Sequence, residues 1–139
     1  MKALVTITIV FCIATLSFGQ EYEAYTKQIK TWSASSQYAS ADSVISVALE
    51  QFPNNPDLMC RKARIRAWVG NLSQADSIAN QILNIDPHNL EAYKIKSDVA
   101  YWSQNAYELL LLTNEIKLWY PEDLNFKYYE AHALYKLDS

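Results

Sequence analysis

The stretch NIDPHNLEAY, residues 84–93, interrupts a chain whose apolar residues otherwise recur at helical spacing. Proline has no backbone N–H and its ring clashes with the preceding turn, so a helix that reaches Pro87 ends there. Two other prolines, Pro53 and Pro121, stand 34 residues to either side of it. A fixed period of this length is the length of a helix–turn–helix repeat.

The period sets the boundaries of the repeats. The sequence predicts three repeats and a partial fourth, over residues 22–55, 56–89, 90–123 and 124–139. The last residue of each full repeat has a side chain that accepts hydrogen bonds from free N–H groups at a helix start: Asn55, Asn89 and Asp123. Pro56 then occupies a first helical position, where its missing N–H costs nothing. Within repeat two, Ser73 is expected to cap the second helix.

The predicted core lies on positions that recur in every repeat. Mostly small residues occupy positions eight and twenty, where they allow helices to approach closely: Ile29, Ala63, Ser97 and Ala131, then Ala41, Ala75 and Leu109. Apolar residues at helical spacing predict the buried faces of the second helices: Val44, Ile45, Val47 and Ala48, then Ile78, Ala79, Ile82 and Leu83, then residues 109–112 and Ile116. The continuous apolar run 109–112 predicts a helix covered on both sides.

The period, the small residues at positions eight and twenty and the proline at position 32 resemble the tetratricopeptide repeat (TPR) family over residues 22–139. The resemblance implies an all-α, right-handed α-solenoid of about three and a half helical hairpins. The family favours a large apolar residue at position seven, whereas this chain has polar ones: Gln28, Lys62, Lys96 and Glu130. Arg66 at position eleven is a second departure, and both predict a rotation of the first helices.

The first residues predict export. An uncharged run, residues 3–16, follows Lys2, and Ser17 and Gly19 stand where a signal peptidase prefers small residues. We therefore predict an exported protein with a signal peptide over residues 1–19 and a TPR domain over residues 20–139. The alternative is an uncleaved anchor, although the run is shorter than the roughly 20 residues that span a bilayer.

Composition argues against several functions. The net charge of −3 becomes more negative once Lys2 is removed, which disfavours binding to nucleic acid. Residues 20–139 have one glycine, Gly70, so they cannot form a glycine-rich phosphate loop, and no catalytic or metal-binding motif surrounds His88 or His132. We predict no enzymatic activity, no metal and no cofactor. Cys60, the one cysteine of that segment, is expected to be a small buried residue.

The TPR resemblance implies a ligand groove lined by positions two, five, nine, twelve and thirteen of the first helices. The candidate residues are Arg64, Trp68, Lys94, Asp98, Tyr101, Trp102, Tyr128, His132 and Tyr135. Such a surface suits a protein or peptide partner, or an exported polysaccharide whose sugars stack on the aromatic rings. In the alternative interpretation, Trp68 and Trp102 pack between repeats and Asp98 simply pairs with Arg64.

The partial fourth repeat has a first helix but no second one. Its apolar residues are therefore expected to need another packing partner on the face of residues 124–139: Phe126, Tyr129, Ala133, Leu134 and Leu137. We expect either that the natural chain continues, with any membrane contact made through that further region, or that another subunit covers this face.

Two stretches carry a narrower resemblance. RKARIRAWVGNLSQA, residues 61–75, and DPHNLEAYKIKSDVAYWSQNAYELL, residues 86–110, are similar to the periplasmic repeat region of YaiO-like outer-membrane β-barrel proteins. This resemblance implies a non-catalytic scaffold segment of a larger outer-membrane protein for polysaccharide export or assembly. The alternative is a free-standing secreted or periplasmic adaptor that binds a peptide through its concave aromatic groove.

Overall fold

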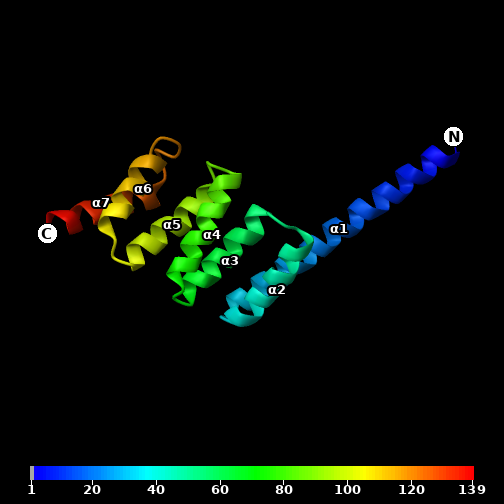
Figure 1. Ribbon diagram of the computed structural model, residues 1–139, viewed down its shortest axis with the longest axis horizontal. Coiled ribbons are helices and arrows are strands. Elements are labelled where there is room, and N and C mark those ends of the chain that lie inside the picture. Colours follow the sequence, from blue (N-terminus) through cyan, green and yellow to red (C-terminus); the bar gives the residue numbers. More distant parts are fainter. Residues whose placement is uncertain (1) are drawn as a thin grey trace. The chain divides into compact units, whose positions relative to one another are not determined.

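The structure is a computed structural model that describes the backbone of residues 2–139 and the side chains of residues 17–139. All regular elements in these residues are helices (Figure 1): α1 Lys2–Ala34, α2 Tyr38–Gln51, α3 Pro56–Trp68, α4 Leu72–Ile85, α5 Leu90–Trp102, α6 Ala106–Ile116 and α7 Leu124–Asp138. The chain divides into two compact units, residues 1–52 and residues 53–139. The prediction of an all-α fold is confirmed.

The first unit is the pair α1 and α2. The ring of Phe52 closes it, with its centroid 5.3 Å from that of Tyr22 and 6.4 Å from that of Phe18 in edge-on contacts. Helix α1 passes through Gly19 without interruption. The apolar run of the expected signal peptide lies outside the residues whose side chains are described, and its cleavage stays a prediction.

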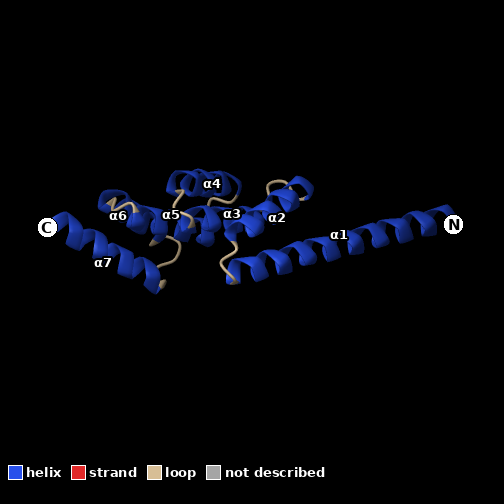
Figure 2. Cartoon of the chain, turned by 90° about the horizontal axis from the view of Figure 1, so that it is seen from below, coloured by secondary structure: helices blue, strands red, loops and turns tan. Residues whose placement is uncertain are grey.

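The second unit repeats with the expected period. Helices α3, α5 and α7 begin at residues 56, 90 and 124, and helices α4 and α6 begin at residues 72 and 106. Each helix packs against the next along the chain, and α3 also packs against α5. Figure 2 shows α4 and α6 on one side of this unit and α3, α5 and α7 on the other. First helices of successive hairpins therefore form a common face.

The helix caps explain why a new helix begins shortly after each proline of the repeat. The side chains of Asn55, Asn89 and Asp123 accept hydrogen bonds from N–H groups in the first turns of α3, α5 and α7, at 3.1, 2.9 and 2.9 Å, as predicted. The prediction that Ser73 caps α4 is wrong. Asn71 holds the non-helical position and accepts from the Gln74 N–H at 3.2 Å, so Ser73 already lies inside the first turn.

The turns inside the hairpins share one position at which φ is positive. Ser36, Gly70 and Gln104 stand 34 residues apart, and all three have positive φ, at 58°, 83° and 57°. Glycine adopts this left-handed conformation freely, whereas in other residues the Cβ atom makes it unfavourable. The turn geometry is thus a property of the hairpin, and only Gly70 matches it by residue type.

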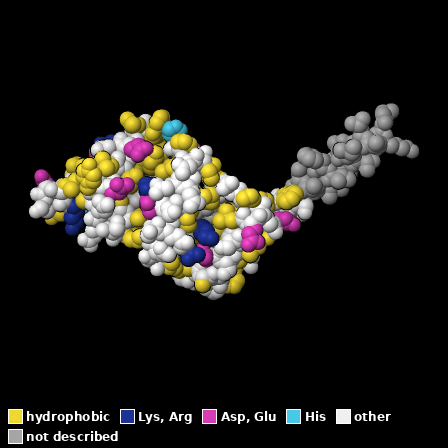
Figure 3. Space-filling model, in the orientation of Figure 1, with side chains coloured by type: hydrophobic (Ala, Val, Ile, Leu, Met, Phe, Trp, Pro, Cys, Tyr) yellow, Lys and Arg dark blue, Asp and Glu magenta, His cyan; other side chains and the backbone are white. Residues whose placement is uncertain are grey.

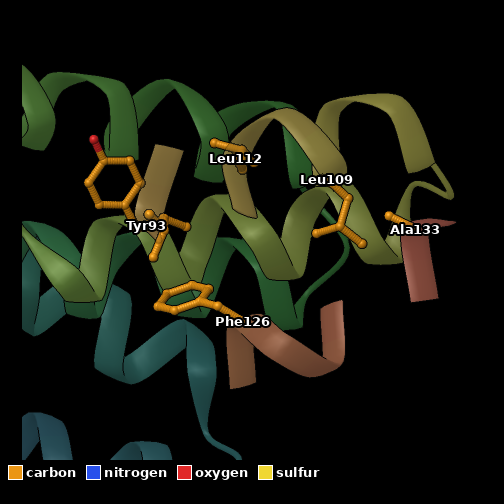
Figure 4. Packing of buried hydrophobic residues seen from close by; sticks show 7 residues of the cluster. Tyr93, Leu109, Leu112, Phe126 and Ala133 are labelled. Atoms are coloured by element: carbon orange, nitrogen blue, oxygen red, sulfur yellow. The ribbon is translucent and has the colours of Figure 1, made fainter. Parts of the chain in front are cut away.

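One cluster of buried core residues in the second unit joins α5, α6 and α7. Tyr93 and Ala133 lie at opposite ends of this cluster, Leu112 and Leu109 lie between them, and Phe126 points in from α7 (Figure 4). The core also corrects two expectations. Val47 and Leu111 are exposed, because each lies on the outer side of its helix, so the run 109–112 is not covered on both sides.

Positions eight and twenty behave as expected with one exception. The residues at these positions are buried in the first three repeats: Ile29, Ala41, Ala63, Ala75, Ser97 and Leu109. Ala131, the equivalent residue in α7, is exposed. The repeat position therefore sets the direction of a side chain, and the neighbouring helix sets its burial.

Two charged residues at position seven, Lys96 and Glu130, contact the preceding second helix or the residue that follows it. Lys96 in α5 places its Nζ 2.7 Å from Asp76 Oδ1 and 2.8 Å from Asn80 Oδ1, both in α4. Glu130 in α7 accepts from Lys117, which directly follows α6. These contacts satisfy the charges at a place where the TPR family prefers apolar packing.

Candidate functional site

Ion pairs join the first helices of the second unit. Arg64 in α3 donates from its Nε to Glu91 Oε1 in α5 at 2.5 Å, and its guanidinium lies 3.9 Å from Asp98. Asp98 also accepts a hydrogen bond from the hydroxyl of Tyr129 in α7. The pairing of Asp98 with Arg64, which was the alternative interpretation of the sequence, is thus present, and Asp98 links α3, α5 and α7.

A hollow of about 210 Å³ opens beside this link. Its lining residues are Arg64, Lys94, Asp98, Asn125 and Tyr129. Lys94 Nζ lies 3.8 Å from Asp123, so both cations of the hollow already have carboxylate partners. The hollow therefore presents both positive and negative side chains, so it does not carry a strong positive charge.

An aromatic cluster continues the face toward the C-terminal end of α5. The ring of Tyr101 lies 4.6 Å from His132, 5.6 Å from Tyr129 and 6.3 Å from Tyr128, measured between centroids. The hydroxyls of Tyr101 and Tyr128 are 3.4 Å apart. The sequence-predicted residues Tyr101, Tyr128 and His132 therefore do come together, with Tyr129 as an additional member.

Raised pKa values keep the phenols of Tyr128 and Tyr129 neutral. Burial raises the pKa of Tyr129 far above its usual range, and its hydrogen bond to Asp98 raises it further. The hydrogen bond between the two hydroxyls raises the pKa of Tyr128, with Tyr101 as the partner. At physiological pH these side chains are therefore hydrogen-bonding aromatic surfaces.

The two tryptophans are surface residues. Trp68 and Trp102 are the last residues of α3 and α5 and are 46% and 44% exposed. Almost half of the surface of each residue faces solvent, and the rest is covered by neighbouring residues. Tyr135 is more exposed still, at 70%. Figure 3 shows hydrophobic side chains gathered where α6 and α7 lie, with charged side chains between them.

Two adjoining hollows, of about 170 and 260 Å³, lie at the end of the aromatic cluster. They share the residues Tyr101, Gln104, His132 and Lys136, and Trp102 lines the larger one. A phenol, an imidazole, an amide and an ammonium group thus face a common space. This arrangement can bind a polar group that carries a short apolar stem.

Sequence reasoning missed several residues of this face. Glu91 and Asn125 occupy position two of their repeats and Lys136 occupies position thirteen, so the positional rule for the groove already pointed to them. The sequence-based choice of groove residues favoured aromatic side chains and therefore omitted these three. Tyr129, at position six, and Gln104, in a turn, carry no such signal.

Burial raises the pKa of the Cys60 thiol to about 12, so it remains protonated, and it is buried as predicted. In the part of the chain that was described, no three acidic, histidine or cysteine side chains are grouped to hold a metal ion. The same residues include no helix that is both long and apolar enough to span a membrane.

Comparison with known proteins identifies the type of fold. No protein-family model matches the chain. No curated protein sequence matches it either. Among solved structures, the chain is similar to the Arabidopsis OM64 TPR domain, with 16% identity and a TM-score of 0.73 over 82% of this chain and 94% of that one. The fold of this protein is therefore an all-α solenoid of the TPR type.

Proposed function

We propose that the protein is a non-catalytic scaffold that binds a protein or peptide partner along the common face of α3, α5 and α7. The observation that carries the proposal is the surface from Arg64 through Asp98 to Tyr101 and Trp102, in which paired charges are followed by aromatic rings that are partly exposed. Partly exposed aromatic side chains are the typical anchors of protein interfaces.

The face is suited to an extended peptide for two reasons. The ion pairs and the hydrogen bond to Asp98 hold the three helices in fixed register, so little order has to be gained on binding. The hollows then provide separate places for successive side chains of a ligand. A polysaccharide is the competing ligand, because Trp102 can also stack on a sugar ring.

A binding experiment with Trp102→Ala tests the proposal. Peptides selected from a random library on the wild-type chain are expected to lose about tenfold or more in affinity, because a central aromatic anchor is removed. Tyr107→Ala is the matched control, since Tyr107 is 65% exposed but belongs to α6. Equal losses in both variants, or a loss of several kcal/mol in the stability of Trp102→Ala, would contradict a binding role for this ring.

We further propose that the protein is exported and acts in the periplasm as the TPR segment of a larger outer-membrane protein for polysaccharide export or assembly. The uncharged run after Lys2 and the similarity of residues 61–75 and 86–110 to YaiO-like repeat regions support this. The alternative is a free-standing exported adaptor.

The intact mass of the native protein, measured separately in soluble and outer-membrane fractions, distinguishes the two. A membrane species much heavier than 15.9 kDa supports the larger protein. A soluble species with the mass of residues 20–139 supports the adaptor, and a species that retains residues 1–19 contradicts cleavage.

A further inference from the structure

Helix α7 packs against its neighbours through one side and leaves another side open. Phe126 and Ala133 are buried in the core that α7 shares with α5 and α6. Tyr129 donates a hydrogen bond to a carboxylate of α5, and Glu130 accepts one from the residue that follows α6. Successive residues turn by about 100° around a helix axis, so the open side is identified by residues three and four positions apart.

Five exposed residues form a stripe along the open side of α7: Leu124, Lys127, Ala131, Leu134 and Asp138. They are three, four, three and four positions apart, which is the spacing of the residues that face the partner helix in a coiled coil. None of these five residues lines a hollow of the candidate site. The stripe, which we call the α7 seam, is therefore a surface separate from the proposed groove.

The α7 seam is complementary to itself in charge. When two copies of a helix cross antiparallel about a two-fold axis, residues at equal distances from that axis face each other. An axis midway between residues 127 and 138 places Lys127 opposite Asp138 of the partner subunit at both ends of the contact. Within one chain, Lys127 pairs with Glu122 at 3.6 Å, and both side chains are exposed, so this pair contributes little that would be lost on exchange.

The same axis makes the α7 seam complementary in size. Residues 131 and 134 are also equally distant from it, so Ala131 lies opposite Leu134 of the partner subunit. A small residue opposite a large one lets the two helices approach closely and removes the leucine from water. The seam, in reverse direction, thus supplies the charges and sizes that it needs from a partner. This self-complementarity favours a second copy of the chain over an unrelated helix.

We propose that the chain forms a two-fold symmetric dimer in which the α7 seams of two copies pack antiparallel. The inference goes beyond the proposed peptide-binding function and does not depend on it, because the seam and the groove use different residues. One pair of helices makes a small interface, so we expect weak association, with a Kd of about 100 µM. At the roughly 1 µM protein of a urea denaturation the chain is then a monomer, in which Leu134 is exposed.

Sedimentation velocity of the full chain between about 1 and 500 µM tests the proposal, and we expect the wild type to change from monomer to dimer over this range. Ala131→Arg should raise the Kd by about tenfold or more, because a long charged side chain then lies in the middle of the seam. Ala131 is exposed in the single chain, so this variant should fold, which circular dichroism checks. Lys30→Asp, at an exposed cation of α1, is the control for charge reversal and should change the Kd by less than about twofold.

An exchange of charges between two variants tests the antiparallel register. Lys127→Asp places two carboxylates opposite each other at both ends of the contact, and Asp138→Lys places two ammonium groups there. Each variant alone should therefore dimerise about tenfold more weakly than the wild type. In an equimolar mixture the two variants present opposite charges to each other at both ends, so their Kd should return to within about threefold of the wild-type value. A fluorescent label on one variant identifies the mixed dimer.

The remaining outcomes distinguish this dimer from other occupants of the seam. A wild type that stays monomeric at about 500 µM would overturn the dimer and leave the seam to a later helix of a longer chain or to another protein. Association that Ala131→Arg leaves unchanged would also overturn it and assign the contact to another surface, such as the apolar run 3–16. Weakening in both charge variants without recovery in the mixture would overturn the antiparallel register.

Peptide selection keeps this inference apart from the proposed function. A wild type that dimerises but selects no peptide would overturn the groove alone. Peptides that bind equally to the wild type and to monomeric Ala131→Arg would support two independent surfaces.

Discussion

Helices α5 and α7 occupy the same place in successive repeats, yet they are buried to different extents. Helix α5 has neighbours on both sides and buries six residues, including Ser97 and Val99. Helix α7 packs against α6 and buries two, Phe126 and Ala133. The comparison teaches that a repeat pattern specifies which side chains point inward, whereas the next helix in the stack decides which of them lose contact with water.

The largest expected effect distinguishes the two sides of α7. Phe126→Ala should lower the free energy of unfolding by about 3–5 kcal/mol, because a fully buried ring leaves a cavity in the core shared with α5 and α6. Leu134→Ala should change it by less than about 0.5 kcal/mol, because Leu134 is 51% exposed. Urea denaturation measures both. Similar losses in the two variants would show that α7 is covered on both sides.

A second prediction concerns the buried tyrosine of α5. Burial and the hydrogen bond to the Glu115 carboxylate raise the pKa of Tyr93 to about 12, from 10.0. A raised pKa in the folded state stabilises the fold below the unfolded value, and that stability is lost as pH rises through the folded value. The Tyr93 contribution should fall by about 1–2 kcal/mol between pH 10 and pH 12.

Urea denaturation of wild type and Tyr93→Phe at several pH values in this window checks the prediction. Tyr93→Phe should lose less stability with rising pH, because phenylalanine does not ionise. Parallel curves for the two proteins would mean that the Tyr93 hydroxyl has the same pKa in the folded and unfolded chains.

Substitutions at position eight should have a smaller effect, which differs between α5 and α7. The Ser97 hydroxyl is buried, and no hydrogen-bond partner for it is found among the described residues. Ser97→Ala should therefore raise the free energy of unfolding by about 1 kcal/mol. Ala131→Ser, the reverse change at the exposed position of α7, should alter it by less than about 0.5 kcal/mol. A destabilised Ser97→Ala protein would indicate a bonded hydroxyl.

The smallest effect tests the shared turn geometry. Gln104→Gly should stabilise the chain by about 0.5 kcal/mol, because glycine relieves the positive φ at the cost of a more flexible unfolded chain. Gly70→Ala should destabilise it by about 1 kcal/mol, since a side chain is introduced at a φ of 83°. Thermal melts of the two variants compare the hairpins directly. A loss of stability in Gln104→Gly would mean that the Gln104 side chain contributes more than the strain costs.

Much of the fold was predictable because local chemistry repeats. Asn55, Asn89 and Asp123 are side chains that favour helix starts wherever they occur, and the proline spacing placed the hairpins. The error at Ser73 arose because Asn71 and Ser73 are both good caps, and only the turn at Gly70 determines which residue precedes the helix. For the candidate site, the positions were predictable, but the partners of Arg64 and Asp98 were only partly so.

The sequence by itself determined the helical hairpin, its length and most of the side chains that face inward, because periodicity, capping and turn residues act over a few neighbouring residues. The tertiary structure alone decided the exposure of Trp68, Trp102 and Ala131 and the pairing of Arg64 with Glu91. Burial and ion pairing depend on atoms from a different helix, and their positions follow from the packing of one hairpin on the next.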